Sequence, residues 1–507
     1  MKSTVLRMAL GCLALLGLAS AAAVPAAAQA PASGPNYAAI DSYVSNSLAG
    51  TPGFALSIVH GDQVVHVKGF GAASSGSPVT GDTPFVLGSE AKSFTALGIM
   101  QLKERGSLDL DAPVQHYLPW FRVADPTYSR QISIRQLLNQ TSGLPPSFPL
   151  ETPVTSVASR VHDLATVNLP YPPGRMFQYS NSNYDTLGLV VEAVSGQSYG
   201  DYMQQHVFAP LDMTHTYASE SAAKAGGLAP GHAWFFGLPV AFDNYRSDFV
   251  PAGWIASSAS DMGRYLVAQL NGGSYAGRSV LSPQGIAEMH RGVAKDADLT
   301  YGMGWAEASV NGIPVVFHDG EAVTFHTDMI LVPGTGWGVE VIANASSMPV
   351  NVSNSIDATA KGVISTLAGQ PAPFTPSPLT TYIVFDLLVG VLVGFQVWSL
   401  VRVLRGPAQR GRGGRLWILR RMVMPLAWRV AAASIPVGLL FGVLGGLIGA
   451  SPLLIAETDL GVSVIGISGL LLINGALRSA RAYRSMRSPN IALAAAVMPA
   501  AVREVAS

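Results

Sequence analysis

The sequence has little cysteine and little charge. Among 507 residues there is one cysteine, Cys12, and it lies in the first hydrophobic run. A mature chain without that run would have no thiol, which excludes disulfides, cysteine nucleophiles and thiolate metal sites. Charged residues make up 12% of the chain and the formal net charge is zero, so the chain as a whole has no electrostatic attraction for nucleic acid, and no nucleic-acid partner is expected.

Two further patterns are missing from the sequence. The ten histidines show no spacing typical of metal ligands, and no glycine-rich phosphate loop is present. We therefore expect neither a metal nor a cofactor.

The N-terminus has the three-part layout of a secretory signal peptide. Lys2 and Arg7 precede an apolar stretch, residues 8–24, and a small-residue site ends at Ala30. This predicts a signal peptide over residues 1–30. A retained N-terminal anchor helix is the alternative, but the Ala-x-Ala ending and the abrupt polar sequence after it favour cleavage.

Hydrophobic residues make up 49% of the chain, and long runs of them follow residue 368. A proline-rich stretch, residues 369–380, predicts a stiff, extended linker. Three apolar segments come next, and each has about the length needed to cross a bilayer. Buried core helices are the alternative for each. We expect a transmembrane region over residues 381–487 and a cytoplasmic tail over 488–507, with helices at about 382–401, 431–449 and 460–477.

The placement of arginine predicts the orientation of these segments. The loop between the second and third segments contains Glu457 and Asp459 but no Lys or Arg. By the positive-inside rule the arginine-rich segments are cytoplasmic, so residues 31–380 lie outside the membrane. Membrane lipid is then an expected partner. The arginines are Arg402, Arg405, Arg410, Arg412, Arg415, Arg420, Arg421 and Arg429 after the first segment, and Arg478, Arg481, Arg484 and Arg487 after the third.

Four glycines of the second segment, Gly442, Gly445, Gly446 and Gly449, would allow close helix contact. The segments could therefore also pack against a membrane partner.

Residues 36–368 alternate strand-like apolar runs with helical stretches, as a mixed α and β domain does. Phe54–His60 and Gln63–Val67 flank a Gly-Asp turn and predict a β-hairpin. Met329–Val332 and Gly338–Ala343 predict a second strand pair. The sheet would then take strands from both ends of the domain, with helices between them.

The strongest chemical signal is Ser89 followed by Lys92. Apolar residues after Ser89 predict a buried helix that ends at Gly106. Three positions separate Ser89 from Lys92, so both side chains lie on the same helix face within hydrogen-bonding reach. A serine hydroxyl is a weak nucleophile, and a lysine acts as a base only where its neutral form is favoured. Ser-x-x-Lys alone, however, occurs by chance in most long proteins.

Two other segments add to this signal. Tyr179-Ser180-Asn181 follows a Pro/Gly turn, and on a loop it could bring a phenol and an amide to the nucleophile. His318-Asp319-Gly320 follows a strand-like run, where an edge strand could offer backbone N–H groups to a substrate.

In this order and spacing the three segments resemble the active-site triplet of the serine β-lactamase/penicillin-binding-protein superfamily, and most closely its class C-like branch. That branch includes D,D-peptidases, D-aminopeptidases and esterases. The resemblance covers about 330 residues and none of the membrane region. It implies an α+β fold, with an antiparallel sheet flanked by helices and a helical subdomain. The supporting segments are residues 137–144, 210–213, 261–262 and 301–305.

The resemblance also implies roles for single residues. Ser89 would be acylated, and Lys92 and Tyr179 would share the general-base and general-acid work. Which of the two accepts the serine proton is left open. The remaining implied residues are Asn181, His318 and Gly320 for substrate binding, and the backbone amides of Ser89 and Glu321 for the oxyanion hole.

Five residues depart from the family pattern. Glu90 and Ala91 stand where relatives usually have an apolar residue and Ser or Thr, but neither should face the nucleophile. The other three are more consequential. His318 stands where many relatives have lysine, Thr324 where glycine is common, and Glu321 would add repulsion for carboxylates if it faced the cleft. Histidine is mostly neutral above pH 6.5. We therefore expect a membrane-anchored serine hydrolase acting on small-molecule or peptide substrates, namely neutral esters, amides or cationic amino ends. The alternatives are a β-lactamase or D,D-carboxypeptidase, a penicillin-binding sensor acylated without turnover, and an inactive binding protein that has kept the fold.

Overall fold

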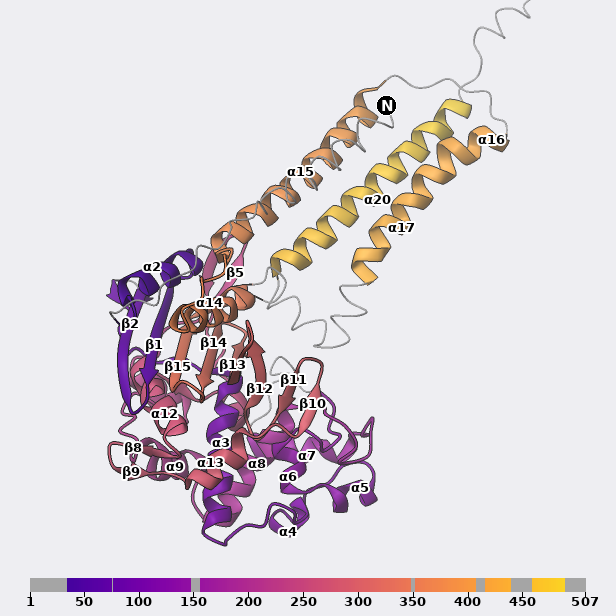
Figure 1. Ribbon diagram of the computed structural model, residues 1–507. Helices are drawn as coiled ribbons and strands as arrows, with labels where there is room; N and C mark the ends of the chain where they lie inside the picture. Colours follow the sequence, from indigo (N-terminus) through magenta and orange to yellow (C-terminus); the bar gives the residue numbers. More distant parts are fainter. Residues whose placement is uncertain are drawn as a thin grey trace, which may run out of the picture.

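The structure is a computed structural model of the chain. It describes residues 34–74, 76–146, 156–347, 352–406, 415–438 and 458–487. The predicted signal peptide and the predicted cytoplasmic tail lie outside the described residues. The described chain forms a domain built on a large sheet, followed by long C-terminal helices (Figure 1).

An antiparallel sheet forms the centre of the domain, and in the described residues it has nine strands in the order β10-β11-β12-β13-β14-β15-β1-β2-β3. β1 (Gly53–His60) and β2 (Gln63–Ser74) form the predicted hairpin, and β14 (Phe325–Val332) pairs with β15 (Trp337–Ala343) as predicted. β15 also pairs with β1, so both ends of the domain meet within the sheet. The other strands are β3 (Ser77–Pro78), β10 (Ala294–Asp296), β11 (Leu299–Tyr301), β12 (Ala306–Val310) and β13 (Ile313–Ala322).

Helices cover both faces of the sheet (Figure 1). α12 packs on one face and α14 on the other, and we call these the α12 face and the α14 face. Because side chains alternate along a strand, each face has its own apolar core; α3 contributes to the core of the α12 face and α2 to that of the α14 face. The bounds are α2 (Tyr37–Ser47), α3 (Ala91–Glu104), α12 (Ala259–Leu270) and α14 (Val352–Leu367).

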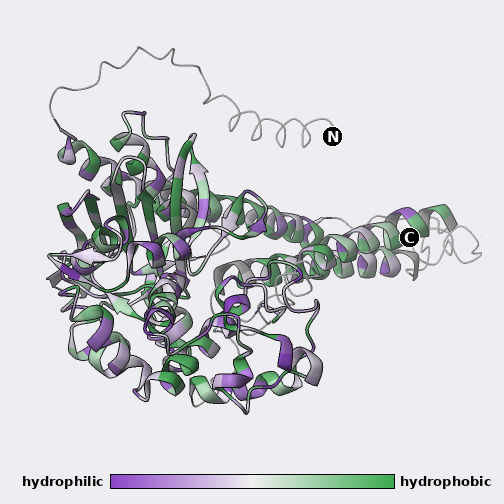
Figure 2. Cartoon of the chain, turned by 60° about the horizontal axis from the view of Figure 1, so that its bottom comes forward, coloured by the Kyte–Doolittle hydropathy of each residue, from purple (hydrophilic) through white to green (hydrophobic). Residues whose placement is uncertain are grey.

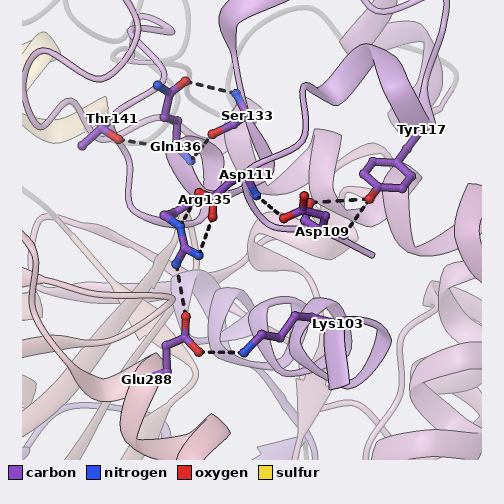
Figure 3. A network of polar contacts seen from close by, with 9 residues as sticks. All are labelled: Lys103, Asp109, Asp111, Tyr117, Ser133, Arg135, Gln136, Thr141 and Glu288. Atoms are coloured by element: carbon purple, nitrogen blue, oxygen red, sulfur yellow. Dashed lines mark hydrogen bonds and ion pairs between the residues drawn. The ribbon is translucent and has the colours of Figure 1, made fainter. Parts of the chain in front are cut away.

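A group of helices extends the domain beyond α3. An ion-pair network joins two of them to α3: Arg135 of α6 pairs with Asp111 and Glu288, and Glu288 of α13 accepts from Lys103 of α3 at 2.9 Å (Figure 3). These side chains are partly exposed to solvent, and exposed ion pairs contribute little to stability. The helices are α4 (Val114–Tyr117), α5 (Pro126–Gln131), α6 (Ile134–Leu138), α7 (Val157–Asp163), α8 (Asn181–Ser195), α9 (Tyr199–Met203) and α13 (Pro283–His290).

Shorter elements complete the domain. β5 (His232–Phe235) and β6 (Leu238–Ala241) form a small sheet with β16 (Ala345–Ser346), and β4 (Phe85–Val86) pairs with β7 (Ala256–Ser257). The others are β8 (Ser274–Tyr275), β9 (Arg278–Ser279), α10 (Glu220–Ala225) and α11 (Val250–Gly253).

The proline-rich linker is shorter than predicted and packs against the domain. α15 begins at Pro378, inside the predicted linker. Thr375 and Ser377 are buried. The Tyr43 hydroxyl lies 3.1 Å from Thr375 Oγ1, and Ser355 Oγ donates to the Pro376 carbonyl at 3.0 Å. The linker thus fixes the start of α15 to the domain rather than acting as a free spacer.

Two long apolar helices, rather than three, are found among the described residues. α15 (Pro378–Arg405) contains the first predicted segment, and α20 (Thr458–Arg487) contains the third. By length and composition, Pro378–Arg405 and Gly461–Arg484 could each cross a membrane. The second predicted segment begins in α17 (Met424–Gly438), but residues 439–449, and with them the four glycines, lie outside the described residues. α16 (Arg415–Ile418) precedes α17, and α20 packs against α15 and α17 (Figures 1 and 2).

Candidate active site

Ser89 lies in a tight turn that leads into α3. The turn is the 3₁₀ helix η1 (Gly88–Glu90), directly before Ala91. Residues 83–102 are buried with one exception, Ser89, which is partly exposed. The hydroxyl is therefore accessible from outside while the backbone around it is held by the core.

Two glycines allow this turn to approach β13. Gly88 has φ +55°, and a Cβ there would lie 2.5 Å from the Glu321 nitrogen. A Cβ on Gly320 would lie 1.9 Å from the Leu87 carbonyl oxygen. Neither position accepts a side chain without moving backbone. This close approach brings the turn that contains Ser89 near the backbone of Glu321.

Lys92 donates to three oxygens around the nucleophile. Its Nζ lies 2.9 Å from Ser89 Oγ, 2.7 Å from Asn181 Oδ1 and 2.7 Å from the Ala252 carbonyl oxygen. The side chain is fully buried. These contacts fix the amine beside the hydroxyl, as the spacing in the sequence predicts.

Burial changes the protonation of Lys92. It lowers the pKa of the amine to about 7, although the charges of Asp185 and Asp319 act in the opposite direction. Asp185 is itself fully buried on α8, and burial raises its pKa well above the ordinary value, against the effect of Arg160 and Lys92. None of the three oxygens that accept from Lys92 belongs to a carboxylate, and with a pKa of about 7 the neutral amine is accessible near pH 7.

Tyr179 lies beside both groups. Its phenol shares a hydrogen bond with the Ser89 side chain, and Lys92 Nζ lies 4.8 Å from the centre of its ring. Burial, reinforced by Tyr301, raises the pKa of Tyr179 well above 10. The phenol is therefore protonated at neutral pH.

Asn181 is the first residue of α8. The sequence had suggested that it lies on a loop, and the structure corrects this. Gln140 holds this helix start: its Oε1 accepts from the Ser180 backbone N–H at 3.0 Å and also from the Asn183 side chain. Gln140 has φ +56°, so its backbone is held in a left-handed conformation. The helix start explains why Asn181 has a fixed direction toward Lys92.

His318 lies on β13 at the point where the strand loses one neighbour. β12 pairs with residues 313–317 of β13, whereas residues 318–322 pair with β14 on the other side. The predicted edge is therefore local: β13 is internal up to Phe317 and open from His318 onward. An extended substrate could align along this stretch.

Both ring nitrogens of His318 are engaged. Nδ1 lies 2.6 Å from the Asp319 carbonyl oxygen and must donate, because a carbonyl only accepts. Nε2 lies 3.0 Å from the Tyr301 hydroxyl and accepts from it. Burial lowers the pKa of His318 to about 4; Asp319 opposes this shift and Lys92 adds to it. The ring is neutral at any ordinary pH.

Glu321 does not point toward the nucleophile. Its neighbour Ala322 belongs to the core of the α12 face, so alternation directs Glu321 to the opposite face. There its Oε1 accepts from Ser346 Oγ at 3.0 Å. The expected repulsion of a substrate carboxylate by Glu321 is therefore not supported. Thr324 is buried in the following turn and donates to Asn244 Oδ1 at 2.7 Å.

The structure brings the side chains of Ser89, Lys92, Tyr179, Asn181 and His318 to one place, whereas those of Glu321 and Thr324 point elsewhere. It also adds three that the sequence reasoning missed: Tyr301, Asp185 and Gln140. Tyr301 and Gln140 both lie in segments that carry the family resemblance, which is the signal that could have found them. Among the described residues no three His, Cys, Asp or Glu side chains gather as metal ligands.

Comparison with known proteins gives one family. A model described as Beta-lactamase matches residues 40–361. Protein flp of Staphylococcus aureus is 30% identical over 303 residues, which are 58% of this chain and 60% of that protein. Penicillin-binding protein 4 of Amycolatopsis lactamdurans is 32% identical over 308 residues, 58% of this chain and 81% of that protein.

The fold agrees with this family. The structure of an octameric penicillin-binding protein homologue from Pyrococcus abyssi has a TM-score of 0.58 and 25% identity, covering 67% of this chain and 79% of its own. The chain spans about 60% of the length of the flp proteins that it matches.

Proposed function

Because the chain belongs to the Beta-lactamase family, we propose that it is a membrane-anchored, extracytoplasmic serine hydrolase that forms an acyl-enzyme on Ser89. Its substrates would be esters or amides, including D-amino-acid peptides with a neutral or cationic end, rather than acyl donors with a free carboxylate. The observation that carries the substrate part is His318, whose two nitrogens are already bound within the protein.

The first step would be proton transfer from Ser89 to Lys92. The amine lies 2.9 Å from the hydroxyl, and its pKa of about 7 gives a large neutral fraction at neutral pH. A general base works best when its pKa lies near the working pH. Tyr179 is the weaker candidate for this step, because a protonated phenol cannot accept the proton. We therefore assign Lys92 as base and Tyr179 as the hydrogen-bonding group that passes a proton to the leaving group.

Ser89 Oγ would then attack the substrate carbonyl carbon. The backbone amides of Ser89 and Glu321 would stabilise the oxygen that becomes negative, which in such sites lowers the barrier by several kcal/mol, about 3 for one donor. The Tyr179 phenol would give its proton to the leaving group and take up in exchange the proton that Lys92 received from Ser89, so that both groups return to their starting states. Attack of water on the ester at Ser89, with the same base, would release the acid.

Asn181 and β13 would position the substrate. The Asn181 side chain reaches Lys92 and is partly exposed, so its amide can also hold a substrate amide. The open stretch of β13 from His318 offers backbone groups. A lysine at position 318 would bind a carboxylate directly, whereas a neutral, fully hydrogen-bonded histidine cannot.

Membrane anchoring rests on α15 and α20, which are long and apolar enough to span. The arginines after each of these segments support an extracytoplasmic domain by the positive-inside rule. This orientation is part of the proposal.

The test is hydrolysis by the purified full chain in detergent. We expect steady turnover of p-nitrophenyl butyrate at a higher kcat/KM than benzylpenicillin or a D-Ala-D-Ala peptide, and no turnover by Ser89→Ala. A single burst with a trapped adduct would support a sensor instead. Faster hydrolysis of benzylpenicillin would overturn the substrate assignment, and full activity of Ser89→Ala would overturn the mechanism.

A further inference from the structure

The β5–β6 hairpin is unusually apolar for an exposed turn. Residues 233–242 read AWFFGLPVAF and include no charged side chain. Exposed turns are normally rich in Gly, Asn, Asp, Ser and Pro for conformational reasons and in polar groups for solvation. In this hairpin Leu238 is 66% exposed, Val240 51% and Phe235 41%. A surface of this kind needs an apolar partner.

The hairpin has a packed face and an open face. Trp234 is buried and pairs with Pro239 across the two strands. Phe235 pairs with Leu238, and Ala233 with Val240, so their side chains share the opposite face. The exposed apolar residues are thus gathered on one side and are not scattered.

The packed face lies on the start of α15 (Figure 1). The ring of Trp234 stacks on Tyr382 with centroids 4.7 Å apart. Three residues further along, a Cβ on Gly237 would lie 3.2 Å from Asp386 Oδ2 and 3.6 Å from Tyr382 Cβ. The hairpin therefore runs along α15 from Tyr382 toward Asp386.

The contact between the hairpin and α15 determines how deep the hairpin would lie in a bilayer that α15 crosses. α15 has 28 residues, or about 42 Å at 1.5 Å per residue, whereas the hydrocarbon core of a bilayer is about 30 Å thick. Centred on the bilayer, the helix extends about four residues beyond the hydrocarbon at each end, and Tyr382 then lies at the outer boundary. Asp386, one turn on, lies about 6 Å further along the axis. The tip of the hairpin reaches the same depth.

We propose that the tip of the β5–β6 hairpin inserts into the outer leaflet of the bilayer, and that its partner is therefore membrane lipid. The proposal rests on the membrane anchoring of α15 proposed above. Phe235, Leu238 and Val240 contact acyl chains next to the headgroups, in the way that aromatic and aliphatic side chains anchor interfacial elements. Trp234 and Tyr382 lie at the headgroup level.

The hairpin also connects the membrane to the candidate active site. The His232 N–H donates to the carbonyls of Thr324 and Asn344, and β5 pairs with β16 at Ser346. Ser346 in turn donates to Glu321, whose backbone amide faces the Ser89 turn. Insertion of the hairpin thus fixes the orientation of the open end of β13 relative to the bilayer.

The test uses single-cysteine reporters in the full chain. Cys12 is the single native cysteine and is replaced by serine, and an environment-sensitive dye is attached at Leu238→Cys. The protein is placed in phosphatidylcholine/phosphatidylglycerol nanodiscs containing a spin-labelled lipid as quencher. Phe235→Cys is the second hairpin reporter, in case the first variant fails to fold. Leu392→Cys, exposed on α15, is the membrane control, and Asp62→Cys, in the β1–β2 turn, is the solvent control.

The proposal expects blue-shifted emission and lipid quenching at Leu238 at least about twofold above the Asp62 reporter, as for an interfacial anchor. Quenching at Leu392 without quenching at either hairpin reporter would overturn the hairpin proposal and leave the anchoring intact. Blue-shifted but unquenched emission at the hairpin would show that protein covers it, which also overturns the proposal. Absence of quenching at Leu392 would overturn the anchoring itself.

Discussion

The two faces of the central sheet shift the pKa of a buried histidine in opposite directions. His318 lies on the α12 face, beside Ser89 and Lys92, and His326 lies on the α14 face, one strand away. Both are buried. His326 Nε2 lies 2.6 Å from Asp357 of α14, and although burial acts to lower its pKa, the Asp357 carboxylate raises it to about 9. His318 has a hydroxyl and a carbonyl as partners, and its pKa falls to about 4.

The difference shows how the candidate active site is made reactive. On the α14 face a cation is stabilised by a carboxylate and contributes to the fold. On the α12 face Lys92 donates to three uncharged oxygens. The hydrogen-bond partners of His318, a hydroxyl and a backbone carbonyl, are also uncharged. Burial without a counter-ion favours neutral bases. One face therefore holds a charged pair, and in the proposed mechanism the other holds the proton acceptor.

The largest effect should come from Lys92→Met. This change keeps the length of the side chain and removes the amine, so kcat/KM for p-nitrophenyl butyrate should fall by about 10³-fold, within the usual range for a general base. The thermal midpoint should stay within about 3 °C of the wild-type value. The substitution removes a buried polar group that has no ion-pair partner, so the lost contacts are offset by the burial cost that is also removed. Activity within a few-fold of the wild type would assign the proton transfer elsewhere.

The pH dependence of the reaction should follow Lys92. Below its pKa of about 7 the amine is charged and cannot accept the serine proton. The kcat/KM should therefore rise about tenfold per pH unit up to pH 7 and level off above it. His318 and Tyr179 do not titrate between pH 5 and 9. A profile that falls as the pH rises through 7 would contradict the assignment.

His318→Lys should have a smaller effect than Lys92→Met, and it should change the selectivity between penicillin and ester substrates. A lysine at this position adds a cation at the open end of β13, and charge-assisted hydrogen bonds to carboxylates are about twice as strong as neutral ones. The ratio of penicillin to ester hydrolysis should rise by about tenfold, as for roughly 1.4 kcal/mol of added binding. His318→Gln is the matched neutral control and should leave this ratio unchanged. An equal rise in both variants would mean that charge is not the cause.

Asp357→Asn should lower stability and leave activity within about twofold of the wild type. The His326–Asp357 pair that it breaks lies on the α14 face of the sheet, away from Ser89. Because the pKa of His326 in the fold lies above its ordinary value, the stabilisation is complete below pH 6.5 and is lost as the pH rises through 9. The thermal midpoint at pH 6 should fall by several degrees, for a loss of about 2 kcal/mol. The difference from the wild type should shrink at pH 9.5. A pH-independent difference would refute the ion-pair account.

Local patterns in the sequence predicted local structure well. The β1–β2 hairpin, the β14–β15 pair and the helix after Ser89 follow from alternation, turn residues and helical periodicity. The proximity of Ser89 and Lys92 follows from their three-residue spacing, although Ser89 lies in the 3₁₀ turn before that helix and not on the helix itself. These features depend on neighbours in the chain, so they can be read from the sequence.

Features that depend on tertiary placement could not be predicted in this way. The bond between Tyr301, at the end of β11, and His318 joins two strands that β12 separates in the sheet. The direction of Glu321 depends on the register of β13. A shift of one residue would have turned Glu321 to the other face. The apolar hairpin at residues 233–242 was not predicted from the sequence, and its meaning depends on its contact with Tyr382.

The central claim is acylation of Ser89 with Lys92 as the base. The most direct measurement is the intact mass of the full chain, followed by peptide mapping, after rapid acid quenching during turnover of p-nitrophenyl butyrate. The account predicts a butyryl adduct on the peptide containing Ser89, absent from Ser89→Ala and formed far more slowly in Lys92→Met. Turnover with no adduct, or an adduct that persists in Ser89→Ala, would contradict it.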